Sequence, residues 1–311
     1  MEAARGRARR AVTVVERVLT IHDADFPTKA LTVRPQPRTL FVRGDVAVLG
    51  RRMVAIVGAR DPSPYGMKVA WEAAHACARA GLVVVSGMAR GLDGQAHRAA
   101  LDAGGLTVGV LGCGLDVAYP RQNADLRSSI PEHGALISEF PAGTRPAPWT
   151  FPQRNRLIAA LADTLLVVEG RVKGGTSNTV AWVMTLNKTV LAVPGRIDEE
   201  LAGGPNLLIQ QGATLYRGPW DLFDVLGLPA PEWVRRESTP DGFAPDVRAA
   251  RAELSGAEAT LFDLMTPQPV HVDQLARRAT LDAGLLLAAL STLELQGLIK
   301  QLPGKHFALA S

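Results

Sequence analysis

The chain has 311 residues, of which 47% are hydrophobic and 21% charged. These proportions are typical of soluble globular proteins, and the length suffices for one sizeable core plus a small second module. No apolar run reaches the roughly 18 residues that a membrane-spanning helix needs, and the basic start lacks the apolar stretch of a secretory signal. We therefore expect a cytoplasmic protein without a membrane span.

Charge and cysteine content narrow the class further. Residues 253–311 hold six acidic and four basic side chains, so the rest of the chain carries a net charge of +6 within a total of +4. This imbalance favours a polyanionic partner, although many basic proteins bind nothing acidic. Cys77 and Cys113 belong to no Cys/His cluster with metal-ligand spacing, which predicts two buried cysteines and no metal site.

The first 228 residues show an alternating pattern. Residues 1–20 are predicted to be a basic tail running into a short helix, and residues 21–45 an extended, proline-interrupted lead-in. Apolar runs predict strands at 53–58, 82–87, 106–112, 135–140, 164–170 and 189–195, with helices near 65–80 and 92–103. Strands this apolar are covered on both faces, so residues 21–228 are predicted to form a doubly wound α/β domain with a mostly parallel sheet.

The last part of the chain is predicted to be a separate domain. Residues 229–252 are rich in proline and glycine and are predicted to be a linker. Residues 253–311 show three helical patterns and two short strands, which is typical of a winged-helix domain. Its third helix, about 281–296, lacks the Lys or Arg of a DNA-reading helix. We expect a protein-contact or regulatory domain, with duplex contact as the alternative, through Arg277, Arg278, Lys300 or Lys305.

Glycine-rich strand ends are the candidate site, since ligands of doubly wound domains bind beyond the carboxyl ends of the strands. Glycine N–H groups and helix starts approach anions closely, and arginines beside them grip phosphate. Between positions 145 and 173 there are five basic and two acidic residues, and Trp149 and Phe151 offer faces on which bases can stack. The combination favours nucleic acid over a single phosphate metabolite.

Several of these residues also have a purely structural explanation. The glycines can be turn residues, Phe151 can belong to the core, and Asp116 can cap a turn. A cap and a structural hydrogen bond explain Asp93 and His97 better than a catalytic pair, and Glu169 ends a strand. Residues 58–66 lack the GxGxxG pattern of dinucleotide sites. We therefore expect no catalytic residue, cofactor or metal.

Six strings follow one another along the chain: VAIVGARDPSPYG (54–66), VVVSGMARGLDGQAH (83–97), VGVLGCGLDVAYPRQN (108–123), ISEFPAGTRP (137–146), FPQRNRLIAAL (151–161) and LAVPG (191–195). Together with the lead-in 23–45, they resemble the DprA/Smf family over about residues 23–226. Members of that family bind single-stranded DNA and load the RecA recombinase onto it.

The resemblance implies an extended Rossmann-like domain, a homodimer, and a role in protecting and processing incoming DNA during natural transformation. Its expected partners are single-stranded DNA and RecA. It also implies a DNA-binding pocket in which N–H and O–H groups hold phosphates, arginines supply charge and an aromatic ring stacks on a base. By position, that pocket comprises Gly58, Arg60, Ser63, Tyr65, Gly66, Gly87, Gly91, Phe151, Arg154, Asn155, Arg156, Lys173, Gly174, Gly175 and Ser177.

Two departures from the family pattern stand out. Many relatives carry a small helical domain before the Rossmann part, for which the first twenty-odd residues leave no room, so that domain is missing or the chain begins late. The loop 173–178 reads KGGTSN where the family more often has serine-glycine-serine.

The alternative to a binding protein is a nucleotide phosphoribohydrolase, because related folds include such enzymes. Their PGGxGTxxE motif supplies a glutamate for acid-base work, but the comparable GGTSNTVAWVM here has no carboxylate, so proton transfer has no obvious agent. A purely structural interaction protein would leave the arginine-rich strand ends unexplained. We therefore predict a single-stranded DNA-binding protein without turnover.

Overall fold

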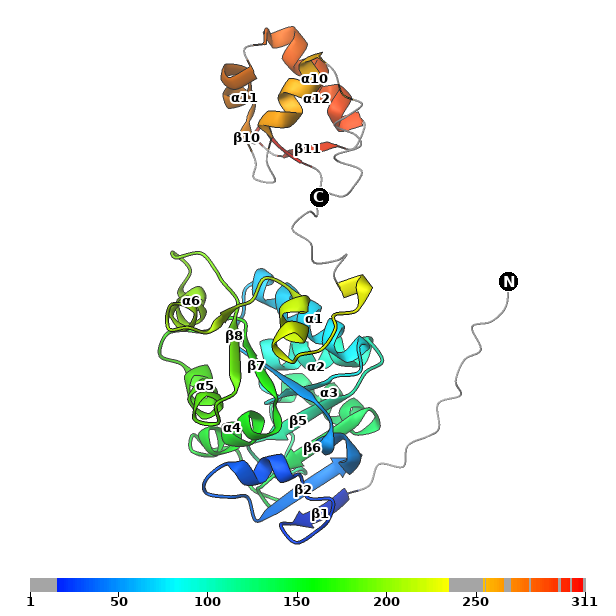
Figure 1. Cartoon of the computed structure of the whole chain (residues 1–311), viewed down its shortest axis with the longest axis vertical. Helices are drawn as coiled ribbons and strands as arrows, with labels where there is room; N and C mark the ends of the chain where they lie inside the picture. The colour runs from blue at the N-terminus through cyan, green and yellow to red at the C-terminus, as the bar shows by residue number, and fades with distance from the viewer. Residues whose placement is uncertain are drawn as a thin grey trace, which may run out of the picture. The chain divides into compact units, whose positions relative to one another are not determined.

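The computed structural model describes residues 16–234, 254, 256–265, 270–279, 281–295, 298–302 and 304–309. Its contacts divide the chain into two compact units, one up to Arg235 and one from Arg236 (Figure 1). The strands of the first unit are β1 (Glu16–Thr20), β2 (Thr39–Gly44), β3 (Met53–Val57), β4 (Val83–Ser86), β5 (Thr107–Leu111), β6 (Gly134–Ser138), β7 (Thr164–Val167), β8 (Thr189–Ala192) and β9 (Thr214–Leu215). Its α-helices are α1 (Pro64–Arg79), α2 (Leu92–Asp102), α3 (Ala124–Ser129), α4 (Thr150–Leu161), α5 (Gly175–Thr185), α6 (Gly203–Gln210) and α7 (Pro219–Val225).

The strands of the first unit form one sheet in the order β1-β2-β6-β5-β4-β3-β7-β8-β9. Strands β3 to β9 pair in parallel, whereas β2 runs antiparallel to both β6 and β1. The parallel part starts at its centre with β3, continues outwards through β4, β5 and β6 on one side, and then through β7, β8 and β9 on the other. The predicted doubly wound, mostly parallel sheet is confirmed, with each of the six predicted strands present.

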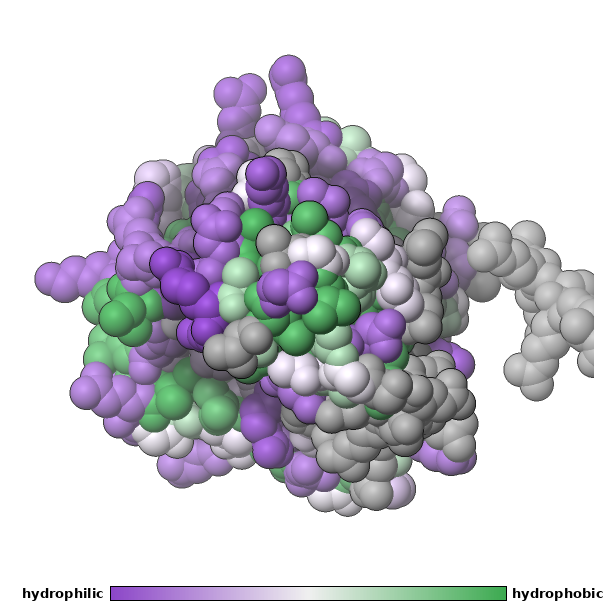
Figure 2. Space-filling view, turned by 90° about the horizontal axis from the view of Figure 1, so that it is seen from above, coloured by the Kyte–Doolittle hydropathy of each residue, from purple (hydrophilic) through white to green (hydrophobic). Residues whose placement is uncertain are grey.

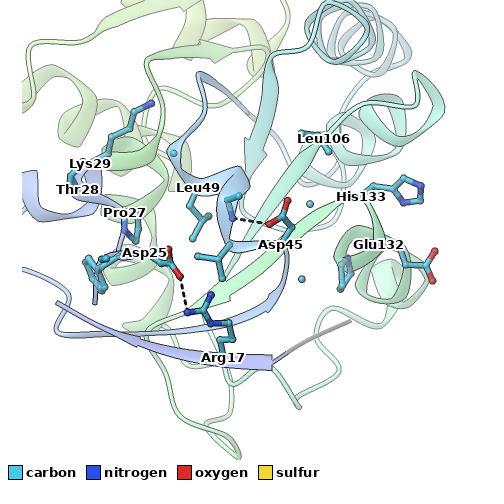
Figure 3. Close-up of a pocket in the computed structure, with 18 residues that line it drawn as sticks. Arg17, Asp25, Pro27, Thr28, Lys29, Asp45, Leu49, Leu106, Glu132 and His133 are labelled. Carbon is cyan, nitrogen blue, oxygen red and sulfur yellow. Dashed lines mark hydrogen bonds and ion pairs between the residues drawn. The ribbon is translucent and has the colours of Figure 1, made fainter. Parts of the chain in front are cut away.

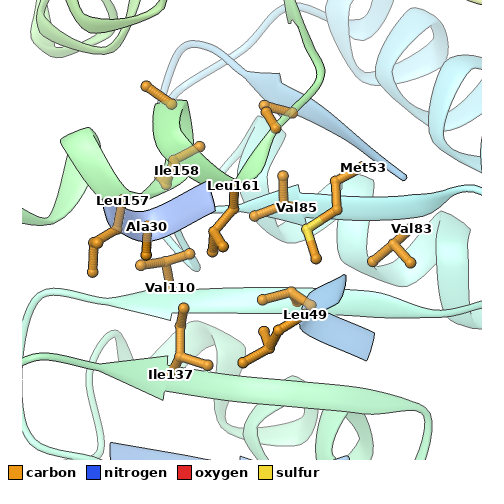
Figure 4. Packing of buried hydrophobic residues seen from close by; sticks show 14 of the residues in the cluster. Ala30, Leu49, Met53, Val83, Val85, Val110, Ile137, Leu157, Ile158 and Leu161 are labelled. Atoms are coloured by element: carbon orange, nitrogen blue, oxygen red, sulfur yellow. The ribbon is translucent and has the colours of Figure 1, made fainter. Parts of the chain in front are cut away.

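Helices cover the sheet on both faces, as the apolar strands require (Figure 1). One core lies under α1, α2 and α7, and a second lies under α4 and α5. In the second core, Leu157, Ile158 and Leu161 of α4 pack over Val85 and Val110 of the sheet (Figure 4). Every residue of β3, β4, β5, β6 and β7 is buried, which explains why these strands read as continuous apolar runs.

Two predictions at the edges of this unit were wrong. Residues Glu16–Thr20 form the edge strand β1 rather than a helix, because pairing with β2 satisfies their backbone and buries Leu19. The rest of the predicted tail, residues 1–15, lies outside the described residues. The predicted linker also starts too early, because Trp233 and Val234 pack on the core beside α1 and α7. Residues 235–252 of that linker lie outside the described part.

The second unit has the predicted winged-helix architecture. Its helices are α10 (Gly256–Leu264), α11 (Val272–Ala279) and α12 (Ala283–Leu295), and its strands are β10 (Val270–His271), β11 (Ile299–Leu302) and β12 (His306–Leu309). Strand β12 lies between β10 and β11, so the predicted hairpin gains a third, two-residue strand. Leu275, Leu290 and Leu293 form part of its core, whereas Leu285 and Leu287 of α12 are exposed. Seen from above, Figure 2 shows a group of apolar residues (green) at the surface, with hydrophilic residues (purple) around it.

Within the described ranges, no helix combines the length and the hydropathy that crossing a lipid bilayer would demand.

Candidate nucleic-acid interface

A groove lies along the carboxyl ends of β3, β4 and β7. It encloses about 1050 Å³ between the loops that follow these strands and the start of α4. A side cavity of about 470 Å³ lies past the ends of β4 and β5. Arg60, Phe151 and Arg154 line both spaces. Because doubly wound domains bind their ligands at this edge, the groove with its side cavity is the candidate site.

Three exposed cations border these spaces without a carboxylate partner in the described part of the chain. Arg60 and Lys173 lie on the groove, and Arg121 lies on the side cavity. Arg60 comes from the loop after β3, whereas Lys173 comes from the loop before α5. The two charges therefore approach the groove from different loops and are available to an anion.

The acidic side chains that line the groove are all engaged. Asp61 pairs with Arg90, and Glu200 pairs with Arg171 at 2.7 Å. Asp93 accepts hydrogen bonds from the backbone N–H groups of Gly87 (3.1 Å) and Ala89 (3.2 Å). Each lining carboxylate of the described groove thus has a hydrogen-bond or ion-pair partner.

Phe151 is a half-buried ring in the wall of the groove. The guanidinium carbon of Arg60 lies 5.5 Å from its ring centroid, and the ring of Tyr119 lies 5.8 Å away at 41°. Phe151 thus contacts a cation and a second aromatic ring, and it does not belong to the hydrophobic core. This environment suits a flat ligand that carries negative charge nearby, such as a nucleotide.

Arg154 forms the floor between the groove and the side cavity. Only 5% of its surface is exposed, and its Nη1 donates to the carbonyl oxygens of Gly87 and Val110. Asp93 is buried close by, where burial raises the pKa of its carboxyl and the charge of Arg154 opposes that shift. Arg154 therefore ties β4, β5 and α4 together beneath the site, and it offers little surface to a ligand.

Close packing explains the glycines at two of the strand ends. A Cβ on Gly87 would lie 2.7 Å from the guanidinium of Arg154. Gly91 has φ +77°, and a Cβ there would meet the carbonyl oxygens of Ala59 and Arg60 at 2.5 Å. These two glycines let the loops after β3 and β4 approach each other and the buried arginine. The two glycines thereby shape the loops that border the groove.

The structure places Ser63, Tyr65 and Gly66 in a neighbouring region rather than in the groove. Ser63 caps α1, accepts from the N–H of Gly66 at 3.1 Å and donates to the buried carboxylate of Glu169. The hydroxyl of Tyr65 donates to the carbonyl of Pro194 at 3.2 Å. Ser63, Tyr65 and Glu169 line a separate cavity of about 420 Å³. Glu169 is held by Ser63 and does not line the groove.

Asn155 and Arg156 diverge although they are adjacent on α4. Asn155 lines the groove, and its Oδ1 accepts from Nε of Arg154 at 3.1 Å. Arg156 is buried elsewhere, with its Nη2 at 2.6 Å from Oε1 of Glu139. Burial raises the pKa of the Glu139 carboxyl, and the charge of Arg156 opposes that shift. Arg156 therefore belongs to a buried ion pair outside the groove.

The loop before α5 presents open backbone to the groove. Lys173, Gly174 and Gly175 line it, and a Cβ on Gly175 would meet nothing within 4 Å. Ser177 points back to cap α5, where it accepts from the N–H of Gly174 and donates to the carbonyl of Val172. The free N–H groups at this helix start are suited to hold an anion.

Of the predicted residues, the groove or its side cavity thus brings together Gly58, Arg60, Gly87, Phe151, Arg154, Asn155, Lys173, Gly174 and Gly175. It does not include Ser63, Tyr65, Gly66, Gly91, Arg156 or Ser177. Our sequence analysis missed Tyr119 and Arg121, which border the side cavity. Both follow the third predicted strand, so their position at a carboxyl end was a usable signal.

A further cavity, of about 860 Å³, lies near the opposite ends of the parallel strands (Figure 3). Its charged side chains are mostly engaged: Arg17 with Asp25 at 2.8 Å, Asp45 with the N–H of Ala47, and Lys29 with Asp163. We assign no function to this cavity. Nowhere in the described residues do three His, Cys, Asp or Glu side chains converge as metal ligands would.

Comparison with known proteins decides the family. Residues 17–227 match the family model described as DNA recombination-mediator protein A, and residues 245–305 match that of the DprA winged helix domain. The chain belongs to the DNA recombination-mediator protein A family. It is 38% identical to DNA processing protein DprA of Bacillus subtilis over 209 residues, which is 67% of this chain and 70% of that protein.

Two solved structures of this family are similar to the chain. The X-ray structure of DprA from Streptococcus pneumoniae has a TM-score of 0.65 and 35% identity. The match covers 67% of this chain and 74% of the Streptococcus pneumoniae chain. The structure of DprA from Helicobacter pylori, whose description concerns its single-stranded DNA binding mode, has a TM-score of 0.62 and 28% identity. The match covers 68% of this chain and 95% of the Helicobacter pylori chain. The family match includes both the Rossmann-like sheet and the groove at its edge.

Proposed function

We propose that the groove binds single-stranded DNA without chemical turnover. The observation that carries this proposal is the half-buried Phe151 ring, which lies close to both the cation of Arg60 and the ring of Tyr119 in the wall of the groove. Base stacking on an aromatic ring beside unpaired cations is how proteins hold single strands without reading their sequence. The family relative from Helicobacter pylori is itself described as binding single-stranded DNA.

We expect affinity for a labelled oligo-dT of several tens of nucleotides to fall with salt, with a log-log slope near −0.7 for each phosphate neutralised. Lys173→Ala removes one exposed cation and should reduce this slope by about 0.7. Phe151→Ala should leave the slope unchanged and lower affinity by about 5- to 150-fold, because one stacked base contributes about 1–3 kcal/mol. Fluorescence anisotropy across a salt series measures both quantities.

The matched duplex is the control ligand for this measurement. We expect it to bind more weakly, because paired bases cannot stack on Phe151. Equal affinity for duplex and single strand would contradict the stacking role. If no DNA bound at moderate salt, the proposal would fail, and nucleoside monophosphates would be the next ligands to test.

We further propose a homodimer that hands its DNA to RecA. Two grooves on one dimer would let one strand cross both and gain avidity. A candidate interface is the sheet edge at β9 with α6, where Leu215 is exposed on the outermost strand. We expect Leu215→Arg to shift the chain to a monomer in light scattering and to reduce its stimulation of RecA assembly on single strands. A variant that stayed dimeric would exclude this edge.

The winged-helix unit is proposed to contact a protein rather than duplex DNA. Its α12 carries no basic residue, and Leu285 and Leu287 are exposed on it. Duplex affinity should therefore survive charge reversal of Arg277 and Arg278 on α11. A large loss of duplex affinity in that double variant would instead assign the unit to DNA.

A further inference from the structure

Trp149 is an exposed aromatic side chain beside the groove. It precedes α4, and 59% of its surface is accessible although it is among the largest apolar side chains. The ring of Phe140, which is buried just beyond the end of β6, lies 5.7 Å from the indole at 75°. Phe140 therefore anchors the indole on one side while the rest of it remains open to solvent. Such exposure of an anchored tryptophan is typical of a binding surface.

The loop that carries Trp149 is held by hydrogen bonds from two directions. Both carboxylate oxygens of Asp116 accept from the N–H of Gly143 at 2.9 Å. The N–H of Gly114 donates to the carbonyl of Thr144 at 3.0 Å. The hydroxyl of Thr150 donates to the carbonyl of Ala147 at 2.9 Å. Because the loop is already ordered, little conformational entropy is lost when a ligand binds to it.

The surroundings of Trp149 resemble those of the groove. Arg145 is exposed and forms no ion pair among the described residues. Arg145 is connected to Trp149 by Pro146, Ala147 and Pro148, and all three of these residues line the groove. Trp149 stands two residues before Phe151, a separation of at most roughly 7 Å along the chain. An aromatic face and a free cation thus continue the edge of the groove towards β6.

We propose that Trp149 is a second base-stacking platform and that Arg145 holds the adjacent phosphate. The single strand then leaves the groove across the end of β6. This inference rests on the proposed function of the groove. An exposed tryptophan can also anchor a protein partner, but the adjoining unpaired cation and the continuity with the groove favour a nucleic-acid strand.

Tryptophan emission distinguishes stacking from mere proximity. The experiment titrates oligo-dT into the full chain and into W149F, recording both emission quenching and the anisotropy of a labelled strand. We expect the strand to quench the wild-type emission, and most of that quenching to disappear in W149F while DNA binding persists, since phenylalanine still stacks. W149A should bind about 5- to 150-fold more weakly. M184A is the matched control, because Met184 is exposed on α5 and lines neither the groove nor its side cavity.

Unchanged quenching in W149F, or wild-type affinity in W149A, would overturn the inference. If W149A kept its DNA affinity but lost self-association or stimulation of RecA, the residue would be a protein contact, which also overturns it. Failure of the groove itself gives a different result, because wild type would then bind no single strand. Circular dichroism of W149A confirms that a loss of affinity does not reflect unfolding.

Discussion

Arg154→Ala is expected to destabilise the protein and to abolish DNA binding at the same time. The guanidinium is buried, donates to the carbonyls of Gly87 and Val110, and lies near the buried carboxyl of Asp93. Its removal leaves two carbonyls and a buried acid without their cation, a change that costs about 3–5 kcal/mol in other buried pairs. Urea unfolding followed by circular dichroism measures this loss, and anisotropy with oligo-dT measures binding.

Arg60→Ala is the matched control, because it removes the same charge from the same groove. Arg60 is exposed and has no carboxylate partner among the described residues, so its loss should weaken binding while leaving the unfolding free energy within about 0.5 kcal/mol of wild type. Arg154→Lys keeps the charge but lacks the planar fork, and it should restore stability only in part. If Arg154→Ala folded as stably as wild type and lost only affinity, Arg154 would be a direct ligand contact instead.

This contrast shows what the sequence could predict about the site and what it could not. The glycine-rich strand ends and the basic stretch between positions 145 and 173 pointed to the edge of the sheet at which the groove lies. They did not distinguish exposed arginines from buried ones. Residues two apart on a helix point about 200° apart, so Arg154 and Arg156 could not both face one ligand. Applying that geometry to FPQRNR would have removed one of them from the predicted pocket.

Long-range partners account for the other differences. Ser63 resembles a phosphate-binding residue in the sequence, but its hydroxyl is bound by Glu169, 106 positions away. The edge strand β1 forms because β2 pairs with it, which no pattern within residues 16–20 discloses. The strands of the parallel part, in contrast, can be predicted from the local sequence alone. Central parallel strands are buried on both faces, so they appear as continuous apolar runs. Strands were therefore predicted well, and individual contacts were not.

His97 is expected to make the protein less stable as the pH falls from 7 to 5. Its Nδ1 lies 2.7 Å from the hydroxyl oxygen of Thr107, and that hydroxyl donates to the carbonyl of Val84. His97 must therefore donate from Nδ1, so its buried Nε2 is unprotonated and has no hydrogen-bond partner. Burial, followed by the charges of Arg154 and Arg98, lowers the pKa of His97 from 6.5 to about 3.

A lowered pKa on a base means that the unfolded chain binds the proton more tightly than the folded protein does. Stability is therefore complete above pH 6.5 and is lost as the pH falls from 6.5 towards 3. At pH 5 the loss due to His97 is about 2 kcal/mol, because each unit between the pH and the unfolded pKa contributes about 1.4 kcal/mol. Urea unfolding at pH 7, 6 and 5 measures this change.

The His97→Asn variant separates this effect from that of the carboxylates. An asparagine amide can still donate to Thr107 but does not titrate, so the variant should lose the pH dependence attributed to His97 even though its smaller side chain lowers stability at every pH. An identical slope in wild type and variant would show that His97 does not carry the effect. Because Arg154 contributes to the lowered pKa, removing that charge should also raise the folded-state pKa of His97, so that the loss of stability ends at a higher pH. The acid sensitivity of the fold and the buried cation under the groove are therefore coupled through the charge of Arg154.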